Sequence, residues 1–338
     1  MKVEKKLHSA ASVSVALILF LILVSSVASA VATQSKSLTI TETRITTNTL
    51  DSEIPVIYGN KIVWQDDRNG NYDIFIYDLS TKKQISTTNK SDQMNPDIYG
   101  NKAVWEDRRN GGGPFKTDIY LQDLSTKKQT RITRNVCANS PAIYKNKIVW
   151  AVTPDVTSED QPYGVSSIYM YDISAKKVTQ FTTSESAFTP AIYGNRVVWM
   201  EWNKGIFMYD FSTKKETQIT STGSESPKIY GNRVVWEDYR SGTPEIYMYD
   251  ISTKKETQIT NDSTDQHRPV IYGNRVVWED LRNGNWDIYM YDISTKKQTQ
   301  ITNDSSDQYF PSINGNRIVW QDYRNGNADI YMCTLKYK

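Results

Sequence analysis

Carboxylates that closely follow a tryptophan are the side chains of this 338-residue sequence best suited to acid–base chemistry. Two carboxylates that face each other across a cavity can cleave glycosidic bonds, as in glycosidases. A catalytic pair should be singular, whereas these acids recur at one position of a repeated pattern. We therefore predict a structural role for them and assign no catalytic residue. The acids are Asp66, Glu106, Asp107, Glu201, Glu237, Asp238, Glu279, Asp280 and Asp322.

A second pattern, Asp-x-Arg-Asn-Gly-Asn-x-Asp, alternates acid and amide oxygens within one short hairpin. Oxygens in this arrangement could bind calcium. The third position is arginine, at Arg68, Arg282 and Arg324, which would bring a positive charge close to the ion. The other interpretation is an Asp–Arg ion pair combined with an Asn-Gly turn. We favour the ion pair, predict neither a metal nor a cofactor, and keep calcium binding as the alternative.

His267 is the one histidine outside the first thirty residues. A histidine-based catalytic triad would have to use it, and a histidine-rich metal site would lack a second ligand. The surrounding residues, Asp265-Gln-His-Arg-Pro, are typical of a polar connection between strands. We expect His267 to be a polar loop residue.

These residues belong to repeats that are each centred on a tryptophan. A period in the low forties, with units made of short strands, is typical of propeller blades. We predict an all-β chain folded as a seven-bladed β-propeller of four-stranded antiparallel blades over residues 39–338. The repeated tryptophans are Trp64, Trp105, Trp150, Trp199, Trp236, Trp278 and Trp320.

Turn residues divide each repeat into four strands. An Ile-Tyr strand leads through Gly-Asn to the Val-Val-Trp strand, and then come Asp-Ile-Tyr-Met-Tyr-Asp and Gln-Thr-Gln-Ile-Thr. The last repeat stops at Asp329-Ile-Tyr-Met-Cys-Thr334, so it lacks the fourth strand. We expect Glu42-Thr-Arg-Ile-Thr46 to supply that strand, to complete the seventh blade and to remove an exposed sheet edge.

The strings Trp-Gln-Asp-Asp-Arg-Asn-Gly-Asn-Tyr-Asp-Ile-Phe-Ile-Tyr-Asp (64–78) and Trp-Glu-Asp-Leu-Arg-Asn-Gly-Asn-Trp-Asp-Ile-Tyr-Met-Tyr-Asp (278–292) resemble TolB-type propeller repeats. The architecture is also similar to propellers of archaeal and bacterial cell-surface proteins and to the propeller domain of prolyl oligopeptidase-like enzymes. The resemblance covers nearly all of the chain after the first thirty residues and implies the fold. TolB itself has six blades and an additional N-terminal domain, so its envelope role is not carried over.

The first thirty residues have the layout of a secretory signal peptide. A basic segment with Lys2, Lys5 and Lys6 precedes the apolar run 15–24 and then Ala28-Ser29-Ala30. We predict a signal peptide over 1–30 and a short linker over 31–38. The protein would then be secreted, periplasmic or on the cell surface, and an uncleaved anchor is the alternative.

The net charge of +2 gives no reason to expect nucleic acid as a partner. Lys-Lys pairs nevertheless recur in the turn before each fourth strand, on the face that also holds the Gly-Asn turns. We call this the basic face, and we call the opposite face, which holds most Asp, Glu and Asn residues, the acidic face. The basic face could contact an anionic surface, and the alternative is a solvated set of turns. The pairs are 82–83, 127–128, 176–177, 214–215, 254–255 and 296–297.

Irregular repeats point to a binding site on the acidic face. The hairpin of blade two expands over 109–116, that of blade three over 151–167, and that of blade four shrinks to 202–205. A long loop beside a short one predicts a notch whose aromatic and acidic residues would suit sugars or peptides. The predicted ligand-binding residues are Phe115, Asp155, Glu159, Asp160, Tyr163, Phe188 and Trp202.

Three Asn-x-Ser sequons begin just after fourth strands, at Asn89, Asn261 and Asn303, and could carry glycan in an exported protein. The function that these features favour is a non-catalytic, extracytoplasmic binding or scaffold propeller. Its partner would be a protein or polysaccharide of the cell envelope. The alternatives are a structural surface-layer component and, less favoured, a carbohydrate-active enzyme.

Overall fold

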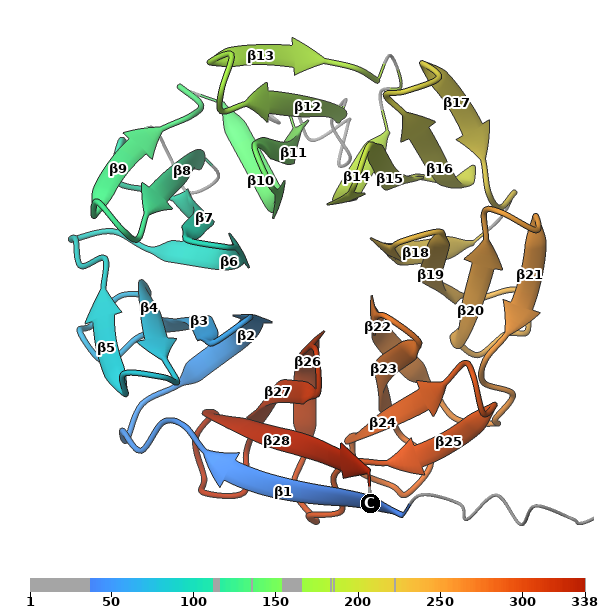
Figure 1. Cartoon of the computed structure of the whole chain (residues 1–338). Coiled ribbons are helices and arrows are strands. Elements are labelled where there is room, and N and C mark those ends of the chain that lie inside the picture. The colour runs from blue at the N-terminus through green and yellow to red at the C-terminus, as the bar shows by residue number, and fades with distance from the viewer. Residues whose placement is uncertain are drawn as a thin grey trace, which may run out of the picture. The chain divides into compact units, whose positions relative to one another are not determined.

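The computed structural model describes residues 37–111, 116–134, 136–153, 166–182, 184, 186–221 and 223–337. These residues form seven four-stranded sheets arranged as the blades of a propeller (Figure 1). All pairings between the named strands are antiparallel, so the predicted fold class is confirmed. No helix in the described part of the chain is long and apolar enough to cross a membrane.

The innermost strand of every blade lies beside the central axis (Figure 1). These strands are β2 (Ser52–Tyr58), β6 (Gln93–Tyr99), β10 (Cys137–Tyr144), β14 (Ala187–Tyr193), β18 (Ser224–Tyr230), β22 (Gln266–Tyr272) and β26 (Gln308–Asn314). The second strands are β3 (Lys61–Asp66), β7 (Lys102–Asp107), β11 (Lys147–Thr153), β15 (Arg196–Glu201), β19 (Arg233–Asp238), β23 (Arg275–Asp280) and β27 (Arg317–Asp322).

The third strands are β4 (Asp73–Asp78), β8 (Asp118–Asp123), β12 (Ser167–Asp172), β16 (Gly205–Asp210), β20 (Glu245–Asp250), β24 (Asp287–Asp292) and β28 (Asp329–Tyr337). The outer strands are β5 (Lys83–Ser86), β9 (Lys128–Arg131), β13 (Lys177–Gln180), β17 (Lys215–Gln218), β21 (Lys255–Gln258) and β25 (Lys297–Gln300). In the seventh blade the outer strand is β1 (Leu38–Arg44), which pairs with β28 from Leu38 opposite Tyr337 to Arg44 opposite Tyr331.

The core lies between blades. Alternation along each strand gives a blade two apolar faces, and only stacking against neighbours buries both. Trp278 of blade six is fully buried, for example, and shares one cluster with Val235, Ile246 and Met248 of blade five. All seven repeated tryptophans are buried in the same way, which explains why this residue sets the sequence period.

Every innermost strand contains a bulge before its proline. One non-glycine residue there adopts a positive φ, as Ile54 does at 51° and Phe310 at 52°. Such a conformation costs a β-branched or aromatic residue on the order of 1 kcal/mol or more, so the surrounding structure has to hold it in place.

Candidate functional site

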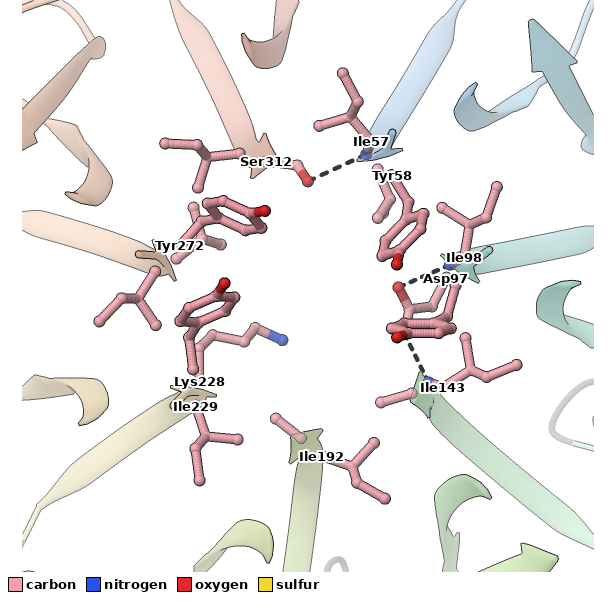
Figure 2. Close-up of a pocket in the computed structure, with 18 of the residues that line it drawn as sticks. Ile57, Tyr58, Asp97, Ile98, Ile143, Ile192, Lys228, Ile229, Tyr272 and Ser312 are labelled. Carbon is pink, nitrogen blue, oxygen red and sulfur yellow. Dashed lines mark hydrogen bonds between the residues drawn. The ribbon is translucent and has the colours of Figure 1, made fainter. Parts of the chain in front are cut away.

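The central channel forms a cavity among the described residues. It encloses a cavity of about 550 Å³, and the innermost strands of all seven blades line it (Figure 2). That volume falls within the range of small-molecule sites. The bulge residue stands at the acidic-face end of each strand, and the residue before the Gly-Asn turn stands at the basic-face end.

A collar of tyrosines surrounds the channel at its basic-face end. Successive rings lie 4.5–4.8 Å apart between centroids, as for Tyr193 and Tyr230 at 4.5 Å and Tyr99 and Tyr144 at 4.8 Å. Burial, together with hydrogen bonds and charges among the phenols, raises the pKa of Tyr58 and of Tyr144 to about 12. The hydroxyl groups of Tyr58 and Tyr144 therefore stay protonated and can donate hydrogen bonds. The collar consists of Tyr58, Tyr99, Tyr144, Tyr193, Tyr230 and Tyr272, with Asn314 in the seventh blade.

Two opposite charges face the channel two residues before the collar. They are Asp97 on β6 and Lys228 on β18, which point into the cavity from opposite sides (Figure 2). The other blades carry Val56, Ala142, Ala191, Val270 and Ser312 at this position.

The Asp97 carboxylate accepts two backbone N–H bonds at 2.8 Å, one from Ile98 and one from Ile143 of the next blade. Enclosure by the channel wall raises the pKa of Asp97 to about 6, although these amides and the Lys228 charge act to lower it. Lys228 reaches solvent inside the channel. Burial by the surrounding wall lowers the pKa of its ammonium, with Asp97 and Glu237 acting in the opposite direction.

In five blades the acid or amide directly after the repeated tryptophan holds the next blade. Glu279 Oε1 accepts a hydrogen bond from the backbone N–H of Phe310, at 2.6 Å, and so fixes a strained bulge residue. Blades three and four carry Ala151 and Met200 at this position. The corresponding pairs elsewhere are Gln65 with Asn95, Glu106 with Ser140, Glu237 with Arg268, and Gln321 with Ile54.

The aspartate one residue later holds the hairpin. Asp280 accepts a hydrogen bond from Trp278 Nε1 at 2.7 Å and two from Arg282, from Nε at 2.7 Å and from Nη2 at 2.6 Å. The guanidinium also lies over the ring of Tyr289, 4.4 Å from its centroid. The favoured Asp–Arg interpretation is therefore confirmed. Within the described ranges, no group of three acids, histidines or cysteines could hold a metal ion.

A row of aromatic rings crosses the acidic face over blades five to seven. Centroid distances are 6.5 Å from Tyr239 to His267, 5.4 Å from His267 to Trp286, 6.1 Å from Trp286 to Tyr309 and 6.0 Å from Tyr309 to Tyr323. We call these five residues the aromatic row. Carboxylates lie along it, and burial together with Asp307 and Glu279 raises the pKa of Tyr309 to about 12.

His267 lies on β22 rather than in a loop, so that expectation was wrong. It lies directly before the bulge of this strand, and its Nδ1 lies 2.7 Å from Glu237 Oε2 of the preceding blade. Burial acts to lower the pKa of His267, but the hydrogen bond and charge of Glu237 raise it overall. Burial likewise acts to raise the pKa of Glu237, and the contact with His267 lowers it overall.

Two of the seven predicted ligand-binding residues fall within the described structure. Trp202 is 43% exposed at the short hairpin of blade four, and Phe188 packs partly against the core between blades four and five. Phe115, Asp155, Glu159, Asp160 and Tyr163 lie outside the described residues. The predicted notch therefore stays a prediction.

Among the predicted sequons, Asn261 and Asn303 are exposed. The Nδ2 atom of Asn89 is buried, and its Oδ1 accepts the backbone N–H of Ser91 at 2.8 Å. The geometry thus makes Asn89 the least accessible of the three to a glycan.

The sequence analysis did not predict the aromatic row or the two channel charges. It used the residues that all repeats have in common, whereas these residues occur at positions where the repeats differ. Aligning the repeats position by position would have shown Asp97 and Lys228 as exceptions in an apolar column. It would likewise have shown Trp286 where blades two and five carry Thr117 and Pro244.

No protein-family model matches the chain, and no curated protein matches it in sequence. Solved structures do match. An oligogalacturonate lyase from Vibrio parahaemolyticus is 12% identical with a TM-score of 0.68, covering 89% of this chain and 97% of that one. The propeller domain of the trilobed protease of Pyrococcus furiosus is 14% identical with a TM-score of 0.69, covering 86% and 96%.

An acylaminoacyl peptidase from Pyrococcus horikoshii is 14% identical with a TM-score of 0.67, covering 85% of this chain and 52% of that one. At these identities the likenesses show a shared propeller fold and nothing finer. A TolB from Acinetobacter baumannii matches with a TM-score of 0.49, which is too low to carry an argument.

Proposed function

We propose that this propeller is a non-catalytic, extracytoplasmic binding protein that recognises a glycan of the cell envelope through its acidic face. The observation that carries the proposal is the aromatic row, five rings in sequence across blades five to seven. Sugars stack their apolar C–H faces on such rings, while neighbouring polar groups hold their hydroxyls.

Carboxylates beside the row supply the hydrogen-bond acceptors. Glu225 lies next to Glu237 and His267, and burial together with the Glu237 charge raises its pKa. Asp307 accepts the backbone N–H of Trp286 at 2.9 Å and so fixes one of the central rings. Because these carboxylates make the face negatively charged, we expect it to bind neutral or amino sugars more tightly than uronic acids.

The row also has the rigidity that recognition needs. Tyr239 donates its hydroxyl to Glu237 Oε2 at 3.2 Å, and Tyr323 accepts a hydrogen bond from Gln321 Nε2 at 2.8 Å. Rings held in this way lose little conformational entropy on binding. Tyr239 still exposes 36% of its surface, so part of the row is open to a ligand.

The test compares two sectors of the same face. Binding of neutral, amino-sugar and uronic-acid oligosaccharides is measured on a glycan array for the wild type, Trp286→Ala and Trp202→Ala. We expect binding of neutral or amino sugars, an affinity lower by about tenfold or more in Trp286→Ala, and little change in Trp202→Ala.

The reverse pattern would move the site to the irregular sector of blades two to four and overturn the assignment to the aromatic row. Binding of none of the sugars would overturn the glycan itself as the ligand. Circular dichroism of each variant verifies that the propeller is intact.

A further inference from the structure

We propose that the central channel binds a small zwitterion, a free amino acid or a short peptide, with its carboxylate at Lys228 and its ammonium at Asp97. This site is separate from the aromatic row and goes beyond the proposed function. The inference starts from the cavity of about 550 Å³ and from the two opposite charges that point into it (Figure 2).

Neither charge is needed by the repeat. The equivalent residues of blades one and six are Val56 and Val270, and those of blades three and four are Ala142 and Ala191. The propeller therefore closes around an apolar residue at this position in most blades. An isolated charge in such a wall costs solvation energy and calls for a partner.

Lys228 has an unused binding capacity. Within the described residues it makes no hydrogen bond and no ion pair, although its ammonium carries three donors. Ala151 and Met200 of blades three and four stand where the other five blades carry the acid or amide that follows the repeated tryptophan. Glu237, in the same blade as Lys228, is already paired with His267. An incoming carboxylate at Lys228 therefore meets little competition.

Asp97 supplies the complementary group. Its two oxygens each accept one backbone N–H, which fixes the carboxylate and leaves further lone pairs directed at the channel. A ligand ammonium can bind there without breaking either bond. The matching residue of blade seven, Ser312, accepts the N–H of Ile57 at 3.2 Å in the same way, without a charge.

The rest of the cavity suits the body of such a ligand. Apolar side chains of the wall would contact its side chains, and the tyrosine collar lines the basic-face end with hydroxyl groups. Thr189, at the rim between Lys228 and blade three, has a hydroxyl oxygen that is buried and lacks a hydrogen-bond partner among the described groups. A peptide amide entering from the acidic face could satisfy it.

The experiment measures binding of L-alanyl-L-alanine to the full chain by calorimetry. Its amide, its N-acetyl derivative and free L-alanine are measured in parallel. We expect the free dipeptide to bind and either blocked form to bind at least about tenfold more weakly. Comparison with L-alanine distinguishes a peptide from an amino acid as the preferred zwitterion.

Variants then assign each end of the ligand. Lys228→Val introduces the residue of blades one and six and should abolish the preference for the free carboxylate over the amide. Asp97→Ser introduces the residue of blade seven, keeps an oxygen for Ile143, and should abolish the preference for the free amine. Lys255→Val, on the outer strand β21, is the control and should change neither preference.

Absence of binding by all four compounds at about 10 mM would overturn the proposal. The same holds if Lys228→Val and Asp97→Ser leave both preferences unchanged. Trp286→Ala should bind the dipeptide as the wild type does, so failure of the glycan proposal and failure of this one are told apart. Lys228→Met is a second variant if Lys228→Val folds poorly.

Discussion

Neighbouring acids on one strand do two different structural tasks. Glu279 is directed at the next blade and holds its bulge, whereas Asp280 binds Trp278 and Arg282 within its own blade. Successive residues of a strand face opposite sides, so a Glu-Asp pair serves both sides at once. The pair therefore recurs in the sequence because one acid joins neighbouring blades and the other holds the hairpin of its own blade.

His267 and Glu237 should make stability depend on pH. The raised pKa of His267 contributes stability that is present below its ordinary value of 6.5 and is lost as the pH rises through the folded-state value. The lowered pKa of Glu237 contributes stability that is present above 4.5 and is lost as the pH falls. Glu279 and Arg268 also act on His267, in opposite directions.

We therefore expect His267→Gln to be less stable than the wild type by about 1 kcal/mol near pH 5.5 and by less near pH 8.5. Urea unfolding at both pH values measures this difference. An equal difference at both values would mean that His267 contributes packing and not charge. Aromatic contacts of the ring with Tyr239 and Trp286 would then account for the loss.

At the scale of strands, a threonine after each outer strand ties it to the third strand. The hydroxyl of Thr302 accepts the N–H of Ile288 at 2.8 Å and donates to Asp287 at 3.1 Å. Thr46, far away in sequence, makes the same two bonds to Ile330 and Asp329, at 2.8 and 2.9 Å. The segment after β1 is thus built as the end of an outer strand.

Thr46→Val should therefore cost as much stability as Thr302→Val, about 1–3 kcal/mol in each case, because a buried N–H and a carboxylate lose a partner. Urea unfolding of the two variants and of Thr43→Val provides the comparison, with the exposed Thr43 as the control. If Thr302→Val lowers the free energy of unfolding and Thr46→Val does not, the role of the N-terminal strand in the seventh blade is contradicted.

The strands and blades could be predicted from the sequence, but most of the candidate site could not. Seven tryptophans at regular intervals specify the blades, because burial between blades acts on the same position each time. Lys228 and Asp97 depart from the repeat, and their position on opposite sides of one channel depends on how the ring places blades two and five. The tertiary contacts of His267 with Glu237 and Trp286 also join three different hairpins. Periodicity cannot show such contacts.

For the whole molecule, the basic face consists of two kinds of residue. Arginines in the Gly-Asn turns bind the neighbouring blade: Arg317 donates to Asn60 Oδ1 at 2.8 Å and to the carbonyl of Gly59 at 3.2 Å. Arg233 does the same toward Asn274 at 2.8 Å. The paired lysines are exposed instead, and the first of each pair has a positive φ, such as 55° at Lys82. Glycine or asparagine would relax that conformation, so the lysines are retained at a conformational cost.

This division predicts that attraction to anionic surfaces comes mainly from the lysines. Changing the six Lys-Lys pairs to Glu-Glu should abolish retention on immobilised heparin, while the free energy of unfolding changes little because these side chains are solvated.

Arg317→Ala should have the opposite effects. It removes two hydrogen bonds between blades seven and one, lowers stability by about 1 kcal/mol and leaves most of the retention intact. The salt concentration that elutes each variant, together with its urea midpoint, separates the two effects. If the lysine variant elutes at the same salt concentration as the wild type, the Lys-Lys pairs do not contact anionic surfaces and serve only as turn residues.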